Sequence, residues 1–144
     1  MERDCAVHKL VADVAIFDGH RVALVKYRNV ARYDGQRGWF LPDDFLGHQE
    51  HPEQAAKRVA KEQTGVVLRT VRLTHIESFG NSAWHLIFHY RADLPRAKKA
   101  KSGANVAALE WFDRSKLPPR DECAHHGWAV DVLATMERKL ARGG

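Results

Sequence analysis

Residues 39–67 have the sequence WFLPDDFLGHQEHPEQAAKRVAKEQTGVV, which divides into a short strand, a loop and a helix. The apolar residues 39–41 predict the strand, and Pro42 with the two aspartates after it predicts that this strand ends in a turn. Residues 52–64 are mostly strong helix formers, and they begin with a proline, which suits the first helical position. Gly65 follows where a helix usually stops. The spacing therefore predicts a helix over residues 52–64.

This stretch resembles the Nudix box when Gly65 is placed on the final glycine of that motif. The matching positions are Glu50, Arg58, Ala60, Glu62, Gly65 and Val66. Because these matches fall in one register, the chain resembles the Nudix hydrolase family. The resemblance implies an α/β protein with the Nudix fold, an α/β/α sandwich around a mixed β-sheet. It also implies a single Nudix-like domain over residues 1–144.

Four positions depart from the motif. Asp43 and Asp44 stand where the family has glycines, and Val59 and Gln63 stand where it has glutamates. Residues 59, 62 and 63 share one face of the predicted helix, and in the family that face presents three carboxylates to divalent metal ions. A valine can neither accept a proton from water nor coordinate a cation. The metal site that the resemblance implies is therefore incomplete.

The resemblance also implies a divalent cofactor, Mg²⁺ or Mn²⁺. Magnesium takes few protein ligands and borrows oxygens from substrate phosphates. We therefore expect either ion to bind weakly in the absence of substrate. The resemblance assigns the metal to Glu62 and Glu50, and it gives Arg58 the role of orienting these carboxylates in catalysis. It identifies no general base.

Asp43 and Asp44 have two interpretations. They could restore the carboxylates missing from the helix and form an altered metal site with Glu50 and Glu62. They could instead be ordinary turn residues, since aspartate tolerates left-handed backbone geometry and is common in turns. Turn chemistry favours the second interpretation. Apart from the resemblance, Val59 would simply belong to an apolar helix stripe that faces the core.

The reaction implied by the resemblance is metal-assisted hydrolysis of the diphosphate bond in a nucleoside diphosphate linked to another moiety. Loss of a general base alone costs roughly 10²- to 10⁴-fold in rate, so we expect weak or altered catalysis. One alternative is a catalytically inactive Nudix-fold module that binds a nucleotide or responds to one. A structural or interaction domain is a third hypothesis. The first two share a nucleotide-type small molecule as the partner.

The rest of the chain has the patterns that such a sandwich needs. Apolar runs separated by glycine, asparagine or aspartate predict strands joined by turns. The predicted strands span residues 8–17, 21–27, 66–79, 83–92 and 106–112. A terminal helix is predicted after Pro118 and Pro119. Its core face is predicted from the helical spacing of Ala129, Leu133, Met136 and Leu140.

Two further segments supply candidate ligand-binding residues. In the strand over residues 83–92, His85 and His89 point to one face and could line a pocket, whereas the aromatic face opposite is expected to be core. In the basic loop that follows, Lys98 and Lys99 could contact phosphates or simply be solvated. The histidine pairs at 48 and 51 and at 125 and 126 lack a recognised zinc-ligand spacing, so we interpret them as loop residues.

Composition indicates a small globular protein that attracts anions. The chain has 144 residues, of which 44% are hydrophobic, and this is enough for one core. Its formal net charge is +5, but the basic residues are scattered without interleaved aromatics, which argues against nucleic acid as the partner. No apolar run approaches the roughly 20 residues that span a bilayer, so we expect a cytoplasmic protein with no membrane partner and reduced cysteines. The oligomeric state stays open.

Overall fold

The structure is a computed structural model that describes residues 8–81, 83–96 and 99–143. The strands in these ranges are β1 (His8–Asp18), β2 (Arg21–Tyr27), β3 (Asp43–Phe45), β4 (Arg72–Phe79), β5 (Trp84–Asp93) and β6 (Val106–Asp113). The α-helices are α1 (Pro52–Thr64) and α2 (Trp128–Gly143). Short 3₁₀ helices are η1 (Ala31–Tyr33), η2 (Arg120–Glu122) and η3 (Ala124–His126).

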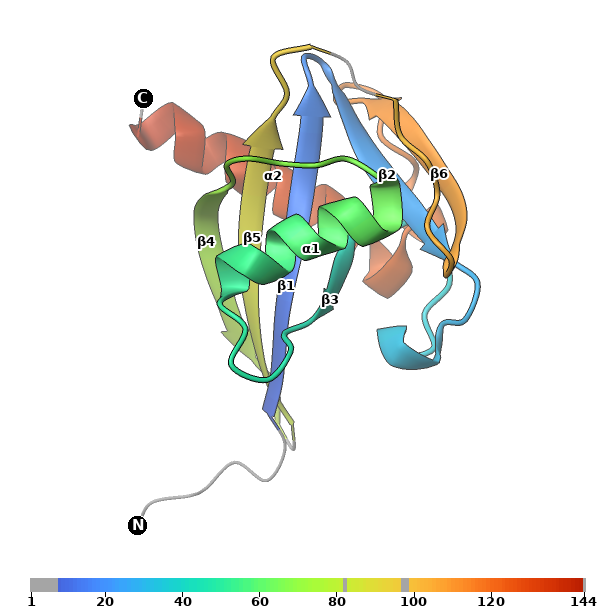
Figure 1. Ribbon diagram of the computed structural model, residues 1–144, viewed down its shortest axis with the longest axis vertical. Coiled ribbons are helices and arrows are strands. Elements are labelled where there is room, and N and C mark those ends of the chain that lie inside the picture. The colour runs from blue at the N-terminus through green and yellow to red at the C-terminus, as the bar shows by residue number, and fades with distance from the viewer. Residues whose placement is uncertain (1–7, 82, 97–98, 144) are drawn as a thin grey trace.

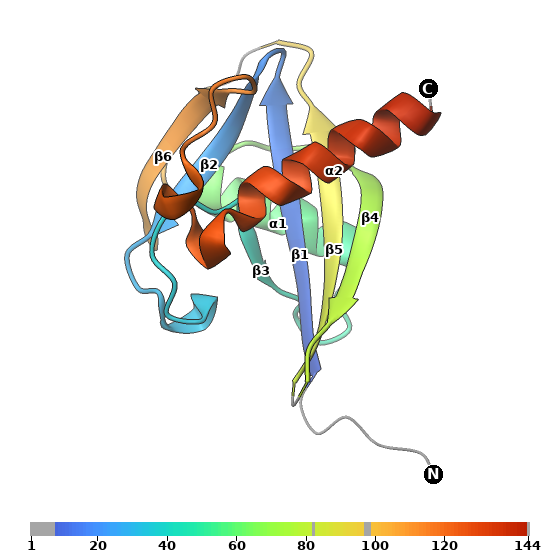
Figure 2. The same ribbon diagram turned by 180° about the vertical axis from the view of Figure 1, so that it is seen from behind.

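The strands form one mixed sheet in the order β4-β5-β1-β2-β6, and β3 pairs with β1 off this path. β1 and β5 run parallel, whereas β1–β2, β1–β3, β2–β6 and β4–β5 are antiparallel pairs. α1 crosses one face of the sheet (Figure 1), and α2 crosses the opposite face (Figure 2). The predicted α/β/α sandwich around a mixed sheet is therefore confirmed.

The bounds of α1 are those that the sequence predicts, and both ends are held by local contacts. At the start, the His51 Nδ1 accepts a hydrogen bond from the Glu53 backbone N–H at 3.0 Å. The Gln54 side chain accepts in turn from the His51 backbone N–H, which completes a capping box. At the end, Gly65 has φ 72°, a left-handed conformation that glycine adopts without steric cost.

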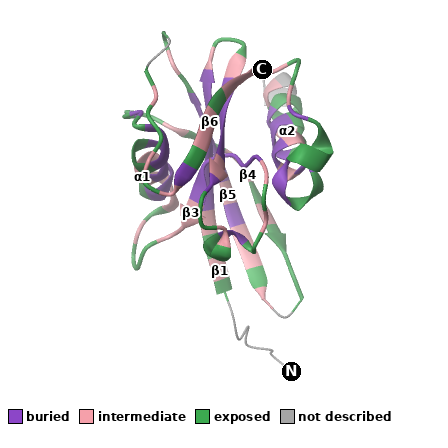
Figure 3. Cartoon of the chain, turned by 90° about the vertical axis from the view of Figure 1, so that its right-hand side faces the viewer, coloured by how far each residue is buried: buried purple, intermediate pink, exposed green. Residues whose placement is uncertain are grey.

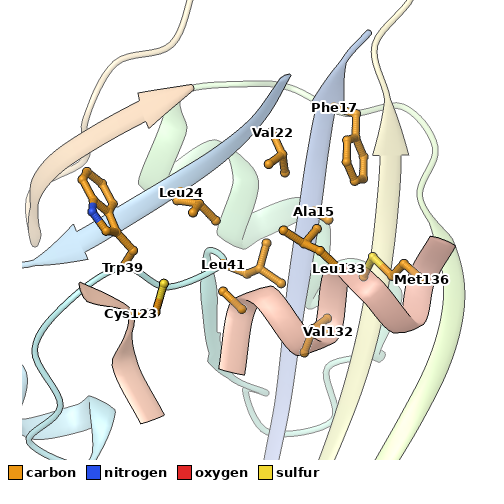
Figure 4. Close-up of a cluster of buried hydrophobic side chains, with 11 residues drawn as sticks. Ala15, Phe17, Val22, Leu24, Trp39, Leu41, Cys123, Val132, Leu133 and Met136 are labelled. Atoms are coloured by element: carbon orange, nitrogen blue, oxygen red, sulfur yellow. The ribbon is translucent and has the colours of Figure 1, made fainter. Parts of the chain in front are cut away.

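Two apolar layers fix the helices to the sheet, one on each face. Figure 3 shows the buried residues gathered on the sheet and on the inner sides of α1 and α2. On the α2 face, Phe17, Leu24 and Met136 belong to one buried cluster, shown in Figure 4. On the α1 face, Ile16 and Val59 belong to another. β1 contributes to both layers because its successive side chains point to opposite faces.

The terminal helix packs as its spacing predicts. Ala129, Leu133 and Met136 are buried, and Leu140 is half-buried. This stripe is therefore core packing against the sheet. None of the helices that the structure describes has the length and apolar character needed to cross a bilayer.

The segment between β2 and α1 differs from the prediction. Residues 39–41 do not form a strand of their own; Trp39 and Phe40 make only isolated bridges, to Cys123 and Val25. The strand in this segment is β3, which contains the two aspartates that were predicted as turn residues, so the turn interpretation is wrong. Tertiary contacts override local turn preference, because β3 pairs with β1 and the aspartate side chains find partners elsewhere in the fold.

Candidate functional site

Arg58 is the centre of a cluster of acidic side chains at the surface of α1. Its Nε and Nη2 donate to Glu50 at 2.8 and 3.0 Å, so the two groups form a bidentate pair. Its Nη1 donates to Asp44 and to Glu62, each at 3.1 Å. Its Nη2 also donates to the Phe45 carbonyl at 2.9 Å. We call Asp44, Glu50, Arg58 and Glu62 the Arg58 cluster.

The charges in the Arg58 cluster are largely compensated. Hydrogen bonding to Arg58 lowers the pKa of Glu50, so this carboxyl stays ionised and paired. Asp44 is held from a second side as well, since the Arg32 guanidinium lies 2.9 Å from its Oδ1. Glu62 is the most exposed of the carboxylates, with 57% of its side chain accessible. Two guanidinium groups thus face three carboxylates.

Val59 and Gln63 lie on the buried side of α1. Val59 has no exposed surface and packs in the apolar layer between α1 and the sheet. The Gln63 Nε2 donates to the Asp43 carbonyl at 2.8 Å, and its Oε1 accepts from the Tyr27 hydroxyl at 2.8 Å. The Gln63 amide nitrogen is therefore hydrogen-bonded to the Asp43 carbonyl oxygen, which could otherwise coordinate a cation. This part of the helix is closed by apolar packing and neutral hydrogen bonds.

Asp43 is buried behind this network. Its Oδ1 lies 3.2 Å from the Tyr27 hydroxyl, and Tyr27 stacks on Tyr33 with ring centroids 3.6 Å apart. Burial raises the pKa of Asp43 well above its usual range, and the neighbouring charge of Asp13 raises it further. The carboxyl group of Asp43 therefore favours the neutral, protonated form.

A cavity of about 360 Å³ opens beside the Arg58 cluster. β1, β4 and β5 contribute part of its lining. The rest comes from η1 and the residue after it, from residues 40–45 around β3, from η3 and from the start of α2. The lining residues are Lys9, Val11, Arg32, Tyr33, Asp34, Phe40, Asp43, Asp44, Phe45, Phe79, His85, Ile87, His125 and Trp128. Its walls are mainly aromatic and apolar. Its charged residues are two cations and three aspartates, and the Lys9–Asp34 and Arg32–Asp44 ion pairs join four of them.

The structure separates the predicted ligand-binding residues. His85 lines the cavity and stacks on Phe79, with ring centroids 4.9 Å apart and planes 5° apart. His89 shares that strand face but has no exposed surface. Lys99 is exposed and lies outside the cavity lining. Lys98 lies outside the described residues.

His89 instead belongs to a buried polar group that the sequence did not reveal. Its Nδ1 lies 2.7 Å from Asp13, and its Nε2 lies 2.6 Å from Glu77. His75 stacks on it with ring centroids 4.4 Å apart. Burial lowers the pKa of His89, but the two carboxylates outweigh it and bring the value to about 9. We call Asp13, His75, Glu77 and His89 the buried histidine cluster.

The aromatic side of β5 is only partly core. Phe88 and Tyr90 pack in the layer beneath α1, whereas Trp84 is 39% exposed near the end of the sheet. The other side of the strand is equally covered, because Ile87 and His89 are buried. Both faces of β5 are therefore buried over part of its length, and strand alternation alone does not separate core from surface here.

A family model of the NUDIX domain matches residues 7–131. The chain belongs to the Nudix family. A search of curated proteins found no match. The Nudix assignment agrees with the α/β/α sandwich and with the register in which Arg58 and Glu62 occupy the helix after the loop.

Solved Nudix structures share this fold at low sequence identity. A MutT NUDIX hydrolase from Burkholderia pseudomallei is 21% identical, with a TM-score of 0.72 over 89% of this chain and 97% of that chain. The NUDIX domain of Shewanella oneidensis NrtR, solved in complex with ADP ribose, is 21% identical, with a TM-score of 0.69 over 96% and 90%. A C. elegans Ap4A hydrolase is 12% identical, with a TM-score of 0.66 over 93% and 98%.

The residues present do not fit a Nudix metal cluster held by the protein alone. Of the positions predicted to bind Mg²⁺ or Mn²⁺, Asp44 and Glu50 are paired with arginine, and Asp43 is buried and favours its neutral form. Glu62 is shared with Arg58 but remains open to solvent. Over the described parts of the chain, the group of three whose possible ligand atoms all lie within 4.8 Å is instead His75, Glu77 and His89.

Replacing the Asp43 carboxyl by an amide is expected to stabilise this Nudix domain at neutral and higher pH. The folded-state pKa of Asp43 is raised, so its contribution to stability is full below the unfolded-state pKa of about 3.9 and is lost as pH rises through the folded-state pKa. Asp43→Asn keeps the shape and cannot ionise. We expect the free energy of unfolding of Asp43→Asn, measured in urea at pH 8, to exceed that of the parent by about 1–2 kcal/mol. Near pH 4 the two free energies should differ little.

The exposed Asp121→Asn serves as the control, and it is expected to change stability little at either pH. A parent-like loss of stability with rising pH in Asp43→Asn would show that Asp43 is not the group responsible.

Proposed function

We propose that this protein binds a nucleoside diphosphate linked to another moiety in the cavity beside the Arg58 cluster, with slow or absent hydrolysis. The observation that carries the proposal is the occupation of the helix face by protein groups. Arg58 pairs with the available carboxylates, and Gln63 donates to the Asp43 carbonyl. A cation would have to displace these contacts before it could assist hydrolysis.

The cavity supports a ligand with a ring and an anionic end. Its volume of about 360 Å³ lies within the range of roughly 300–1,000 Å³ that is usual for small-molecule sites. The stacked pair Phe79 and His85 offers an aromatic surface for a base. Arg32 and Lys9 supply positive charge for phosphates once they exchange their present partners, Asp44 and Asp34, for phosphate oxygens. The net charge of +5 favours the approach of such an anion.

A second candidate function, slow metal-assisted hydrolysis, is favoured by one feature. Glu62 lies one helical turn after Arg58 with more than half of its side chain exposed. A polyphosphate bound in the cavity would bring oxygens of its own, so fewer protein ligands would be needed. In that case turnover would require Glu62, and the metal would bind only when substrate is present.

The test is a panel of nucleoside di- and triphosphates, ADP-ribose, dinucleoside polyphosphates and capped RNA, assayed for thermal shift and turnover with and without Mg²⁺ or Mn²⁺. We expect at least one diphosphate-linked member to raise the Tm by several degrees without metal, since ligand at 100 times its Kd adds about 2.7 kcal/mol. Arg32→Met is expected to weaken that binding about tenfold, because a charge-assisted phosphate contact is lost.

Arg37→Met is the matched control, because Arg37 is exposed and lies outside the cavity lining. Equal losses in the two variants would place the ligand elsewhere. Turnover that needs metal and disappears in Glu62→Gln would replace the binding proposal by the hydrolase. A panel that gives neither stabilisation nor turnover would favour a structural domain.

A further inference from the structure

Strand pairing brings the buried histidine cluster together on the sheet face that α2 covers. Asp13 and His89 are opposite each other in the parallel pair β1–β5, and His75 and His89 are opposite each other in the antiparallel pair β4–β5. Directly opposed residues point to the same face of a sheet. Glu77, two residues after His75, shares that face. Three neighbouring strands thus contribute to one group.

The group has the donor set of a transition-metal site. His75, Glu77 and His89 each offer one ligand atom, and these atoms all lie within 4.8 Å of one another. Two imidazoles and one carboxylate are a donor set typical of zinc, whereas Mg²⁺ prefers oxygen ligands. Glu77 and His89 already meet at 2.6 Å in a hydrogen bond whose proton lies between the carboxylate and the ring Nε2. A cation bound between them would take the place of that proton.

The outer contacts also match a metal site. The His89 Nδ1 is hydrogen-bonded to the Asp13 carboxylate at 2.7 Å. A metal-binding histidine is commonly oriented by such a carboxylate on its second ring nitrogen. The His75 Nδ1 is engaged by the Thr74 hydroxyl at 2.8 Å, which leaves its Nε2 for a ligand role. Asp13 also has a buried Oδ1 with no hydrogen-bond partner.

We propose that His75, Glu77 and His89 bind a divalent cation of the zinc class, with Asp13 positioning His89. The site lies outside the Nudix box, and it adjoins the cavity through Trp128, which lines the cavity and donates to the Glu77 carboxylate at 3.3 Å. Ligand atoms of a tetrahedral zinc site lie roughly 3.4 Å apart, so Glu77 and His89, now 2.6 Å apart, must separate slightly on binding. The His75 ring must also turn out of its stack on His89 to aim its Nε2 at the ion. This movement is feasible because β4 is an edge strand and His75 is only half-buried. Glu77, 36% exposed, marks the side from which the ion enters.

The test uses the full chain, stripped of metal and free of nucleotide. Zn²⁺ binding is measured by calorimetry, and Co²⁺ is used as a probe because its visible absorption reports tetrahedral coordination. We expect one ion per chain and an increase in Tm with Zn²⁺. His75→Ala is expected to lower the affinity for Zn²⁺ at least tenfold and to abolish the tetrahedral Co²⁺ spectrum. Glu77→Gln, which keeps side-chain shape, should do the same.

His20→Ala is the matched control, since that histidine side chain is 77% exposed and lies at the β1–β2 turn. It is expected to leave the affinity and the spectrum unchanged. Zn²⁺ affinity that stays at the parental value in both His75→Ala and Glu77→Gln would overturn the proposal, as would the absence of one-to-one binding in the parent. Neither result would bear on nucleotide binding in the cavity.

Discussion

Val59→Glu is expected to lower the free energy of unfolding by about 4 kcal/mol, in the range for a buried charge without a partner. Val59 has no exposed surface and lies in the apolar layer with Ile16 and Ala60. A carboxylate there loses its hydration and gains no hydrogen-bond donor in return. Its neighbours in this layer are apolar, and the nearby Gln63 amide nitrogen already donates to the Asp43 carbonyl. Urea unfolding at pH 7 measures the change.

Lys61→Glu is the control for Val59→Glu, because it introduces the same side chain at an exposed position of the same helix and is expected to alter stability little. Excess Mg²⁺ is not expected to recover the loss in Val59→Glu. Full recovery with Mg²⁺ would mean that this helix face can still assemble a metal site, and it would contradict the closed arrangement of the structure.

Arg58→Met is expected to lower the free energy of unfolding, measured in urea at pH 7, by about 3 kcal/mol. The arginine is the common partner of Asp44, Glu50 and Glu62, and its loss leaves three carboxylates close together. Breaking a fully buried ion pair costs roughly 3–5 kcal/mol, and the value here is set at the low end because 28% of the Arg58 side chain is exposed. Methionine keeps much of the apolar stem.

Mg²⁺ provides a second readout for Arg58→Met. With the guanidinium gone, the three carboxylates form an oxygen-rich anionic site, so Mg²⁺ is expected to stabilise the variant more than the parent. Arg120→Met is the control, because the ion pair that it breaks with Asp131 is exposed on both sides. If Arg58→Met lowers the free energy of unfolding no more than Arg120→Met does, the Arg58 cluster does not have the stabilising role given to it here.

Local sequence signals predicted the elements whose ends depend on neighbouring residues. The start of α1 follows from a proline at its first position, and its end follows from Gly65, whose left-handed conformation terminates the helix. The hairpin of β1 and β2 follows from Asp18 and Gly19 between two apolar runs. The contact between Arg58 and Glu62 also follows from their spacing of four residues.

The roles of the two aspartates could not be predicted locally. Asp43 and Asp44 have turn-forming side chains, yet they lie in β3 because backbone pairing with β1 and long-range side-chain partners outweigh the local preference. The position of His89 was equally hidden. Alternation places it on the same face as His85, but only the covering of that face by Trp128 and Glu77 makes it buried.

The Nudix family could be read from residue order and spacing, and the same register predicts that Val59 and Gln63 interrupt its metal site. What surrounds these positions depends on the three-dimensional fold. It sets Arg58 among the carboxylates, closes Gln63 onto the Asp43 carbonyl and gathers His75, Glu77 and His89 from two strands. Pairing, burial and charge compensation arise between segments far apart in the chain, so local preference carries no information about them.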